Sequence, residues 1–497
     1  MKQSWLYGCL SLMMMGLAML HLKHLTPWVD EVMFLDTPMH YVKGMGWTTF
    51  AWYSAARQEP FLLYPPLYSM LMALWMKVFG TTLMACRSLN LVITLSIGWG
   101  LLRICRQLGT RPSLPLTVVL VMLLWGTDDM VYMYSNGRPD LLGAAIMTFL
   151  MSEAIRYAKN GRLGWTLMLI SALLLAAAIQ AVVCLLLMLL LAYLLLKDHR
   201  DTLRRIALLS VSGTLLGLSL VCLFMASHGH LTSFLANAVS YSNTLMTLSM
   251  VVLPVLGDFT GTDTTLYLEK IAHCTTEVPL YTRILTVYTH PAYVALLATA
   301  LFIFLSERNS LKTNPLYGTT RCLFAFVCSM PVLMNVAGRF PSYYYWMVYL
   351  PAILLILLLL GLSTSRRALC LTALMSLLLA VQGFACAPQQ SDYPAIEAFM
   401  GRCTMLKGKN VVAPFSVFYE LEQLNSHAYY IGVYPPRYLP DAIDYVILPQ
   451  KDSEYGASRL HDYYDSLNAA DSLQTVMVAE SEATGLKVFK VVRIPGS

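Results

Sequence analysis

The sequence predicts a polytopic α-helical membrane protein that carries a small α/β domain at its carboxyl end. Three observations predict this fold class. Hydrophobic residues make up 57% of the 497 residues and charged residues only 12%, whereas soluble domains carry about 25% charged residues. Long apolar segments alternate with short basic loops. After residue 386 the composition turns polar.

The apolar segments predict about eleven transmembrane helices, because a helix needs about 20 residues to cross the hydrocarbon core. The first segment, 4–22, lacks a convincing small-residue cleavage site, so we interpret it as an uncleaved helix. The apolar run 165–196 is too long for one helix and is predicted to split near Gln180. The remaining spans are expected at about 85–103, 113–131, 141–157, 165–179, 181–196, 206–226, 291–306, 321–337, 343–362 and 368–386.

Basic residues gather in every second loop, which fixes the predicted orientation. These loops, at 103–111, 156–162, 197–205, 308–321 and 366–367, are expected in the cytoplasm by the positive-inside rule. The amino terminus is then cytoplasmic and the polar tail extracytoplasmic, in a plasma membrane or bacterial inner membrane. The net charge of +6 is spread over these loops, which argues against a nucleic-acid-binding face.

Two domains follow from this topology. Residues 1–386 form the membrane domain, with long outer loops at 23–84 and 227–290. The apolar stretch 244–257 is short and interrupted by Pro254, so we expect an interfacial or re-entrant piece there. Residues 387–497 form the extracytoplasmic α/β domain. Its strands are expected at 410–413, 445–448 and 486–492, and its helices at 394–403 and 456–468.

Acidic residues stand where two predicted helices meet the outer face. Asp30 and Glu31 follow the first helix in Trp28-Val29-Asp30-Glu31. They could be a solvated pair that ends the span, or a general base or metal ligand. Asp140 begins the fourth helix, after Arg138 and Pro139. It could cap the helix or orient a substrate or metal.

Basic and aromatic residues accompany these acids. Arg87, at the outer end of a span, could be a snorkelling residue or an anion contact. Arg339 lies beside the aromatic stretch 343–351 and could bind a lipid phosphate. No cysteine or histidine has the spacing of a metal ligand; the single outer histidines are His40, His228, His230, His273 and His290.

In their order along the chain, these pieces resemble the C-type glycosyltransferase superfamily, and most closely its aminoarabinose–lipid A transferases and protein O-mannosyltransferases. The resemblance covers about residues 1–360. The lipid A branch usually carries a lysine directly before its Pro-Pro pair, where this chain has Tyr64. The matching elements are Asp30-Glu31, Pro65-Pro66-Leu67-Tyr68 with Lys77-Val78-Phe79-Gly80, Arg87, Arg138-Pro139-Asp140 and the aromatic stretch 343–351.

The resemblance implies a cavity at the outer face and a polyprenyl-phosphate sugar as donor. Asp30 would deprotonate the hydroxyl of a lipid, glycan or protein acceptor, which then attacks the anomeric carbon in one inverting displacement. Glu31 and Asp140 would orient the acceptor, and Asp30 and Asp140 would hold a divalent Mg or Mn ion. The donor phosphate would meet Arg339, Arg57, Arg87, Arg138 and Tyr64.

Two other classes stay open at this point. One is a transporter or flippase for a lipid-linked glycan, and the other is a non-catalytic membrane scaffold. Transporters place charges within their helices, whereas the acids here stand in outer loops, which favours chemistry at the surface.

Overall fold

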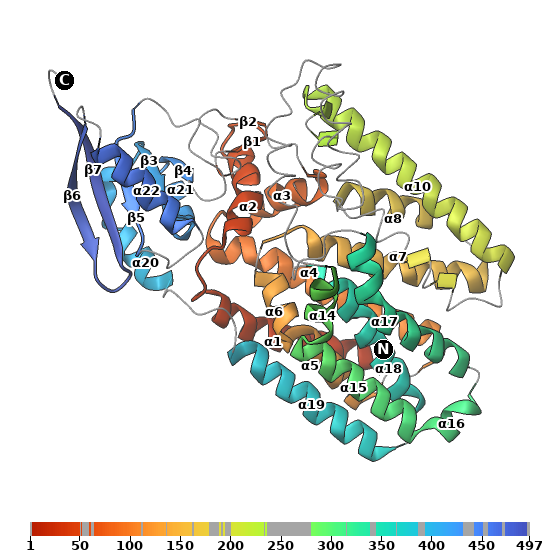
Figure 1. Cartoon of the computed structure of the whole chain (residues 1–497). Helices are drawn as coiled ribbons and strands as arrows, with labels where there is room; N and C mark the ends of the chain where they lie inside the picture. Colours follow the sequence, from red (N-terminus) through yellow and green to blue (C-terminus); the bar gives the residue numbers. More distant parts are fainter. Residues whose placement is uncertain are drawn as a thin grey trace.

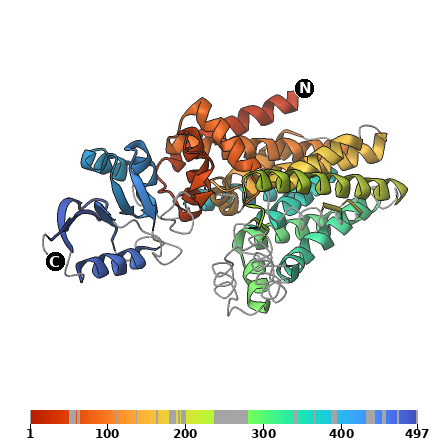
Figure 2. The same cartoon turned by 90° about the horizontal axis from the view of Figure 1, so that it is seen from above.

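The structure, a computed structural model, joins a bundle of long helices to a small α/β domain (Figure 1). It describes residues 2–49, 51, 59–60, 64–110, 113–135, 137–161, 164–177, 188–189, 192–193, 200–232, 234–235, 280–314, 316–337, 344–363, 365–385, 393–430, 442–450, 456–469 and 473–494. The α/β domain lies beyond one end of the bundle, next to its first short helices (Figures 1 and 2).

The predicted spans coincide with helices, except 181–196, most of which lies outside the described residues. Six helices within the described ranges are long and apolar enough to cross a membrane. They are α1 (Lys2–Leu22), α4 (Leu83–Gln107), α7 (Asp140–Asn160), α10 (Arg200–Ser227), α17 (Tyr317–Ala337) and α19 (Arg366–Ala385). Shorter apolar helices are α3 (Leu67–Phe79), α8 (Gly164–Ala177), α15 (Pro291–Ser306) and α18 (Trp346–Leu362). The count of about eleven spans stays a prediction.

The predicted span 113–131 is a bent pair, α5 (Leu114–Gly126) and α6 (Asp128–Ser135), whose axes differ by 57°. Thr127 between them has an extended backbone, which ends the first helix. A Cβ on Gly126 would lie 2.3 Å from the Cβ of Ala380 on α19. The glycine therefore lets α5 and α19 approach closely, as small residues do in membrane bundles.

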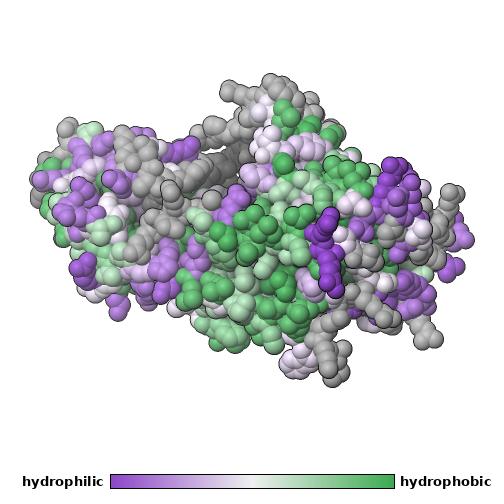
Figure 3. Space-filling view, turned by 90° about the horizontal axis from the view of Figure 1, so that it is seen from below, coloured by the Kyte–Doolittle hydropathy of each residue, from purple (hydrophilic) through white to green (hydrophobic). Residues whose placement is uncertain are grey.

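Apolar side chains cover the outside of the bundle. Figure 3 shows a wide hydrophobic area over its helices, with hydrophilic residues on the α/β domain and at the opposite end. The core helix α18 is buried almost throughout. Exposed apolar side chains include Leu208, Leu215, Leu220 and Leu223 of α10 and Leu371, Leu374, Leu378 and Val381 of α19. An apolar exterior of this extent needs lipid around it, and the chain is a multi-pass membrane protein.

The two ends of the bundle differ in charge. Helices α4 and α7 run in the same direction, and at their carboxyl ends Arg103 lies 2.5 Å from Glu153, which also pairs with Arg156. The 21 residues of α7 span about 31 Å at 1.5 Å per residue, close to the thickness of a hydrocarbon core. The cluster of Arg103, Glu153 and Arg156 therefore lies toward the end of α7 opposite Asp140.

The predicted outer loop 23–84 is largely structured. It contains α2 (Val29–Val42), the strands β1 (Thr48–Thr49) and β2 (Glu59–Pro60), and α3. Helix α2 is buried on most of its surface, so its sequence lacks the amphipathic period that marks a surface helix. The predicted loop 227–290 ends in α14 (Leu280–Tyr288). The short helix α16 (Arg308–Lys312) comes after α15. Residues 236–279, with the apolar stretch 244–257, lie outside the described residues.

The tail forms the predicted α/β domain around a five-stranded sheet of order β4-β3-β5-β7-β6. Strands β3 (Asn410–Ala413), β5 (Tyr445–Leu448) and β7 (Leu486–Arg493) and helices α20 (Tyr393–Met400) and α22 (Ala457–Asn468) confirm the predicted elements. Strands β4 (His427–Tyr430) and β6 (Leu473–Ser481) and helix α21 (Phe418–Gln423) were not predicted. β4 and β6 are the edge strands of the sheet, and β6 has no buried residue.

Candidate functional site

The site begins where α2 starts, just past the first membrane helix. Trp28 is extended, and its backbone N–H donates to Glu31 Oε2 at 3.4 Å. Successive residues of an α-helix point about 100° apart. Asp30 and Glu31, though adjacent, therefore face different neighbours.

Asp30 faces Arg138, which joins it to Asp140. One terminal nitrogen of the Arg138 guanidinium donates to Asp30 Oδ2, and its Nε donates to Asp140 Oδ2 at 2.7 Å. Arg138 and Asp140 are buried, with side chains 4% and 3% exposed, whereas Asp30 is 22% exposed. Asp30 is thus the carboxylate of the three-residue bridge that a substrate can reach.

The turn before α7 places Arg138. Gly137 has a φ of +58°, a backbone conformation that glycine adopts without strain. A Cβ at this position would lie only 2.9 Å from Glu31 Cγ, so a larger residue would also be too close to Glu31. The buried Tyr68 hydroxyl of α3 donates to the Gly137 carbonyl at 2.7 Å. The aromatic ring of Phe34 lies 5.3 Å from the Arg138 guanidinium. Helices α2 and α3 therefore fix the turn from two sides.

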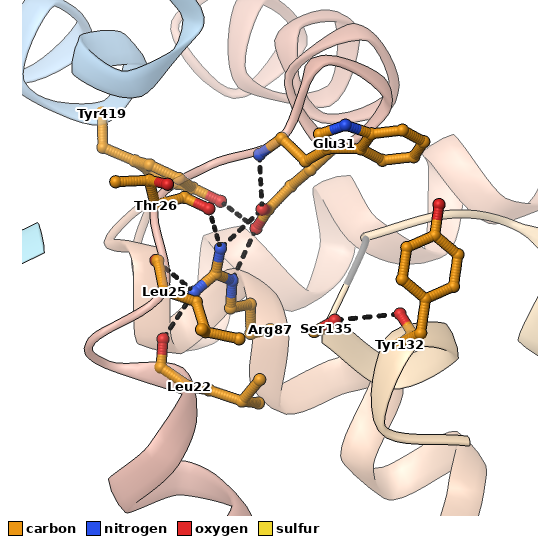
Figure 4. A network of polar contacts seen from close by, with 9 residues as sticks. Leu22, Leu25, Thr26, Glu31, Arg87, Tyr132, Ser135 and Tyr419 are labelled. Atoms are coloured by element: carbon orange, nitrogen blue, oxygen red, sulfur yellow. Dashed lines mark hydrogen bonds and ion pairs between the residues drawn. The ribbon is translucent and has the colours of Figure 1, made fainter. Parts of the chain in front are cut away.

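Glu31 faces Arg87 in a fully buried ion pair. Arg87 Nε donates to Glu31 Oε1 at 2.8 Å and Nη2 to Oε2 at 2.7 Å. The remaining N–H groups donate to the carbonyls of Leu22 (2.5 Å), Leu25 (2.8 Å) and Thr26 (3.2 Å). Figure 4 shows the guanidinium between these carbonyls and the carboxylate. All five donors of the guanidinium are used, so this pair fastens the α1–α2 connection to α4.

The α/β domain closes over this pair. Tyr419 of α21 donates its hydroxyl to Glu31 Oε1 at 3.1 Å (Figure 4). Burial and then the charge of Glu31 raise the pKa of Tyr419 above its usual value, so the phenol keeps its proton. Lys43, at the end of α2, lies 2.6 Å from Glu422 Oε2. The domain thus rests directly on the helix that carries Asp30.

A second polar group stands at the same end of the bundle. The Tyr349 hydroxyl of α18 lies 2.7 Å from His290 Nδ1, and this nitrogen lies 3.5 Å from Asp129 Oδ2 of α6. From the sequence, His290 was one of the single outer histidines. The fold joins His290, which precedes α15, to Asp129 of α6 and Tyr349 of α18.

Some predicted site residues are elsewhere or not described. Tyr64 is buried and packs its ring edge-on against Phe34 at 4.8 Å, so it supports the ring beside Arg138. Arg57 and Arg339, predicted to meet the donor phosphate, lie outside the described residues. The aromatic residues 344–346 and Tyr349 are buried in the bundle and do not form a lipid-facing girdle.

One group of side chains in the described part of the chain has the arrangement of metal ligands. Asp36, His40 and Glu422 each offer a ligand atom, and these atoms lie within 4.8 Å of one another. Sequence analysis treated His40 as a single histidine. The spacing of Asp36 and His40, one turn apart on α2, was the signal for it.

Comparison with known proteins gives no sequence match to a family model or to a curated protein. Solved structures match over nearly the whole chain. AglB oligosaccharyltransferase of Archaeoglobus fulgidus, in complex with an inhibitory peptide and a dolichol-phosphate, is 11% identical, with 99% of this chain and 75% of that chain covered, at a TM-score of 0.51. The apo form of the oligosaccharyltransferase of the same organism is 10% identical, with 98% of this chain and 75% of that chain covered, also at a TM-score of 0.51.

ArnT of Cupriavidus metallidurans, bound to undecaprenyl phosphate, is 12% identical over 98% of both chains, at a TM-score of 0.48. Both enzymes are C-type glycosyltransferases. The oligosaccharyltransferase match confirms the fold expected from the order of motifs: this chain has the C-type glycosyltransferase fold.

Proposed function

We propose that this protein transfers a sugar from a polyprenyl-phosphate donor to an acceptor hydroxyl at the extracytoplasmic face of the membrane. The observation that carries the proposal is the bridge from Asp30 through Arg138 to Asp140 within this fold. It stands at the end of α7 opposite Arg103 and Arg156, which belong to the basic segments that the positive-inside rule assigns to the cytoplasm.

Asp30 is the general base of the proposed reaction. Its exposed carboxylate accepts the proton of the acceptor hydroxyl while that oxygen forms a bond to the anomeric carbon. The bond between this carbon and the phosphate oxygen breaks in the same step, and polyprenyl phosphate leaves with the electron pair. A single displacement of this kind inverts the anomeric configuration.

Arg138 and Asp140 position the base. The guanidinium fixes one Asp30 oxygen, and Asp140, 2.7 Å from Arg138 Nε, fixes the guanidinium. Because Arg138 lies between the two carboxylates, it takes the place of a cation shared by them. The described residues there do not fit a divalent ion held by both Asp30 and Asp140, so the proposal contains no metal-dependent step.

Glu31 and Arg87 hold the site and do not touch substrate. All donors of Arg87 are used within the protein, and both side chains are 1% exposed. The donor phosphate then depends on the basic residues predicted from the sequence, Arg339 and Arg57.

A lipid-linked donor also needs an apolar surface. A pocket between α4, α7 and α18 is lined by apolar residues that include Ala144, Met147, Trp346 and Leu350. Ala144 is one helical turn beyond Asp140, about 6 Å along the axis. The apolar lining of this small pocket therefore begins one turn of α7 from the proposed site.

The test is to incubate the purified chain with a panel of polyprenyl-phosphate sugars and follow donor consumption. Asp30→Asn should lower the rate by about 10²- to 10⁴-fold, the usual contribution of a general base. Asp201→Asn, an exposed acid at the start of α10, is the matched control and should react like wild type. Equal rates for Asp30→Asn and wild type would refute Asp30 as the base. Movement of donors across liposomes without consumption would favour the flippase class instead.

A further inference from the structure

The α/β domain and α2 share a cluster of three side chains that the proposed reaction does not use. Asp36 and His40 lie one turn apart on α2, and Glu422 reaches them from the end of α21. All three are buried, at exposures of 0%, 1% and 6%. Figure 1 shows α2 beside the domain that carries Glu422.

We propose that Asp36, His40 and Glu422 bind a divalent transition-metal ion of the zinc type, which fastens the α/β domain to α2. Two carboxylates and an imidazole are a ligand set that such ions accept. Bonds of about 2.0 Å at tetrahedral angles place two ligand atoms about 3.3 Å apart. His40 Nε2 and Asp36 Oδ1 lie 3.3 Å apart.

The outer atoms of the three side chains are held by other groups, as in built metal sites. Asp36 Oδ2 accepts hydrogen bonds from the Thr49 hydroxyl at 2.6 Å and the Ala51 amide at 3.0 Å. His40 Nδ1 lies 3.0 Å from the Thr48 hydroxyl. These bonds turn Asp36 Oδ1 and His40 Nε2 toward each other.

Glu422 is oriented in the same way. Lys43 Nζ lies 2.6 Å from its Oε2 and also donates to its backbone carbonyl at 2.6 Å. Two buried carboxylates and one ammonium leave one negative charge in the cluster. Either a bound metal ion or a proton held by the cluster offsets that charge, and only the metal ion can be detected by elemental analysis.

The ion would stabilise the part of the molecule that carries the proposed base. Asp36 follows Asp30 by six residues on the same helix, about 9 Å along its axis. A metal that joins Asp36 and His40 to Glu422 therefore limits the movement of α2 relative to the α/β domain. This role is independent of the sugar-transfer chemistry.

The test begins with the metal content of the full chain, purified in detergent without chelator and with any affinity tag removed. Inductively coupled plasma mass spectrometry should find close to one zinc-type ion per chain. Asp36→Asn, His40→Gln and Glu422→Gln should each lose it. The matched controls Asp465→Asn and His427→Gln change exposed residues of the same domain and should retain it.

A second measurement uses the wild-type chain alone, so that it does not depend on how the variants fold. After removal of metal with EDTA, Zn²⁺ or Mn²⁺ is added back, and hydrogen exchange is followed in peptides from α2 and α21. Hydrogen exchange should slow in both peptides when one ion is added per chain. Exchange that is indifferent to the ion, or zinc retained by His40→Gln, would overturn the proposal in favour of a proton held by the cluster.

Discussion

Replacing Arg87 by methionine separates a structural role from a donor-binding role for this residue. The change leaves Glu31 as an uncompensated buried charge, which costs about 3–5 kcal/mol. It also removes the donors to the Leu22, Leu25 and Thr26 carbonyls, at about 1 kcal/mol for each hydrogen bond. We expect a loss of stability well above that of a typical surface substitution.

The assay is thermal unfolding of the purified chain at fixed detergent concentration, followed by tryptophan fluorescence. Arg204→Met, an exposed arginine of α10, serves as the control and should unfold like wild type. The double variant Arg87→Met with Glu31→Leu should unfold at a higher temperature than Arg87→Met alone, because the buried charge is gone. If Arg87→Met unfolds like wild type and loses only affinity for the donor, the structural role is refuted.

Three further changes probe the surroundings of the site. Gly137→Ala introduces a Cβ at a φ of +58° and 2.9 Å from Glu31 Cγ, so it should cost about 1–3 kcal/mol in thermal unfolding and slow donor consumption. Tyr68→Phe removes the donor to the Gly137 carbonyl and should cost about 1 kcal/mol in the same unfolding assay. Burial raises the pKa of Glu420 from 4.5 to about 7. Its favourable contribution is therefore complete below pH 4.5 and is lost as the pH rises through 7. Above pH 8, the free energy of unfolding of Glu420→Gln, measured by pulse proteolysis, should exceed that of wild type by at most about 3 kcal/mol. Below pH 4.5 the two free energies should be equal.

The elements that sequence analysis predicted well are those with local signals. An apolar run of sufficient length marks a membrane helix by itself, and β3, β5 and β7 are short hydrophobic strands between turns. Helix α2 was missed because it is buried around its circumference, so its residues show no period. The edge strand β6 was missed because only some of its residues contact the core.

The candidate site shows where local patterns stop. Asp30, Arg138 and Asp140 each stand out in the sequence, but the pairing of Asp30 with Arg138 spans 108 positions. The contact between Glu31 and Tyr419 spans 388. The periodicity of hydrophobic residues carries no information about contacts between residues so far apart in the sequence. The third ligand of the Asp36–His40 pair comes from the α/β domain for the same reason, which is why His40 looked isolated.

Asp30 and Glu31 show how neighbouring acids acquire different roles. Both follow the first apolar segment and both could end a span or serve as a base, so composition does not distinguish them. The helical rotation of about 100° between them turns Glu31 toward Arg87, where every donor is used and both side chains are 1% exposed. It turns Asp30 toward Arg138, where the carboxylate stays 22% exposed. A general base must meet its substrate, whereas a residue that fixes a helix must be shielded from water. The difference in exposure therefore supports our proposal that Asp30 is the base and that Glu31 supports α2.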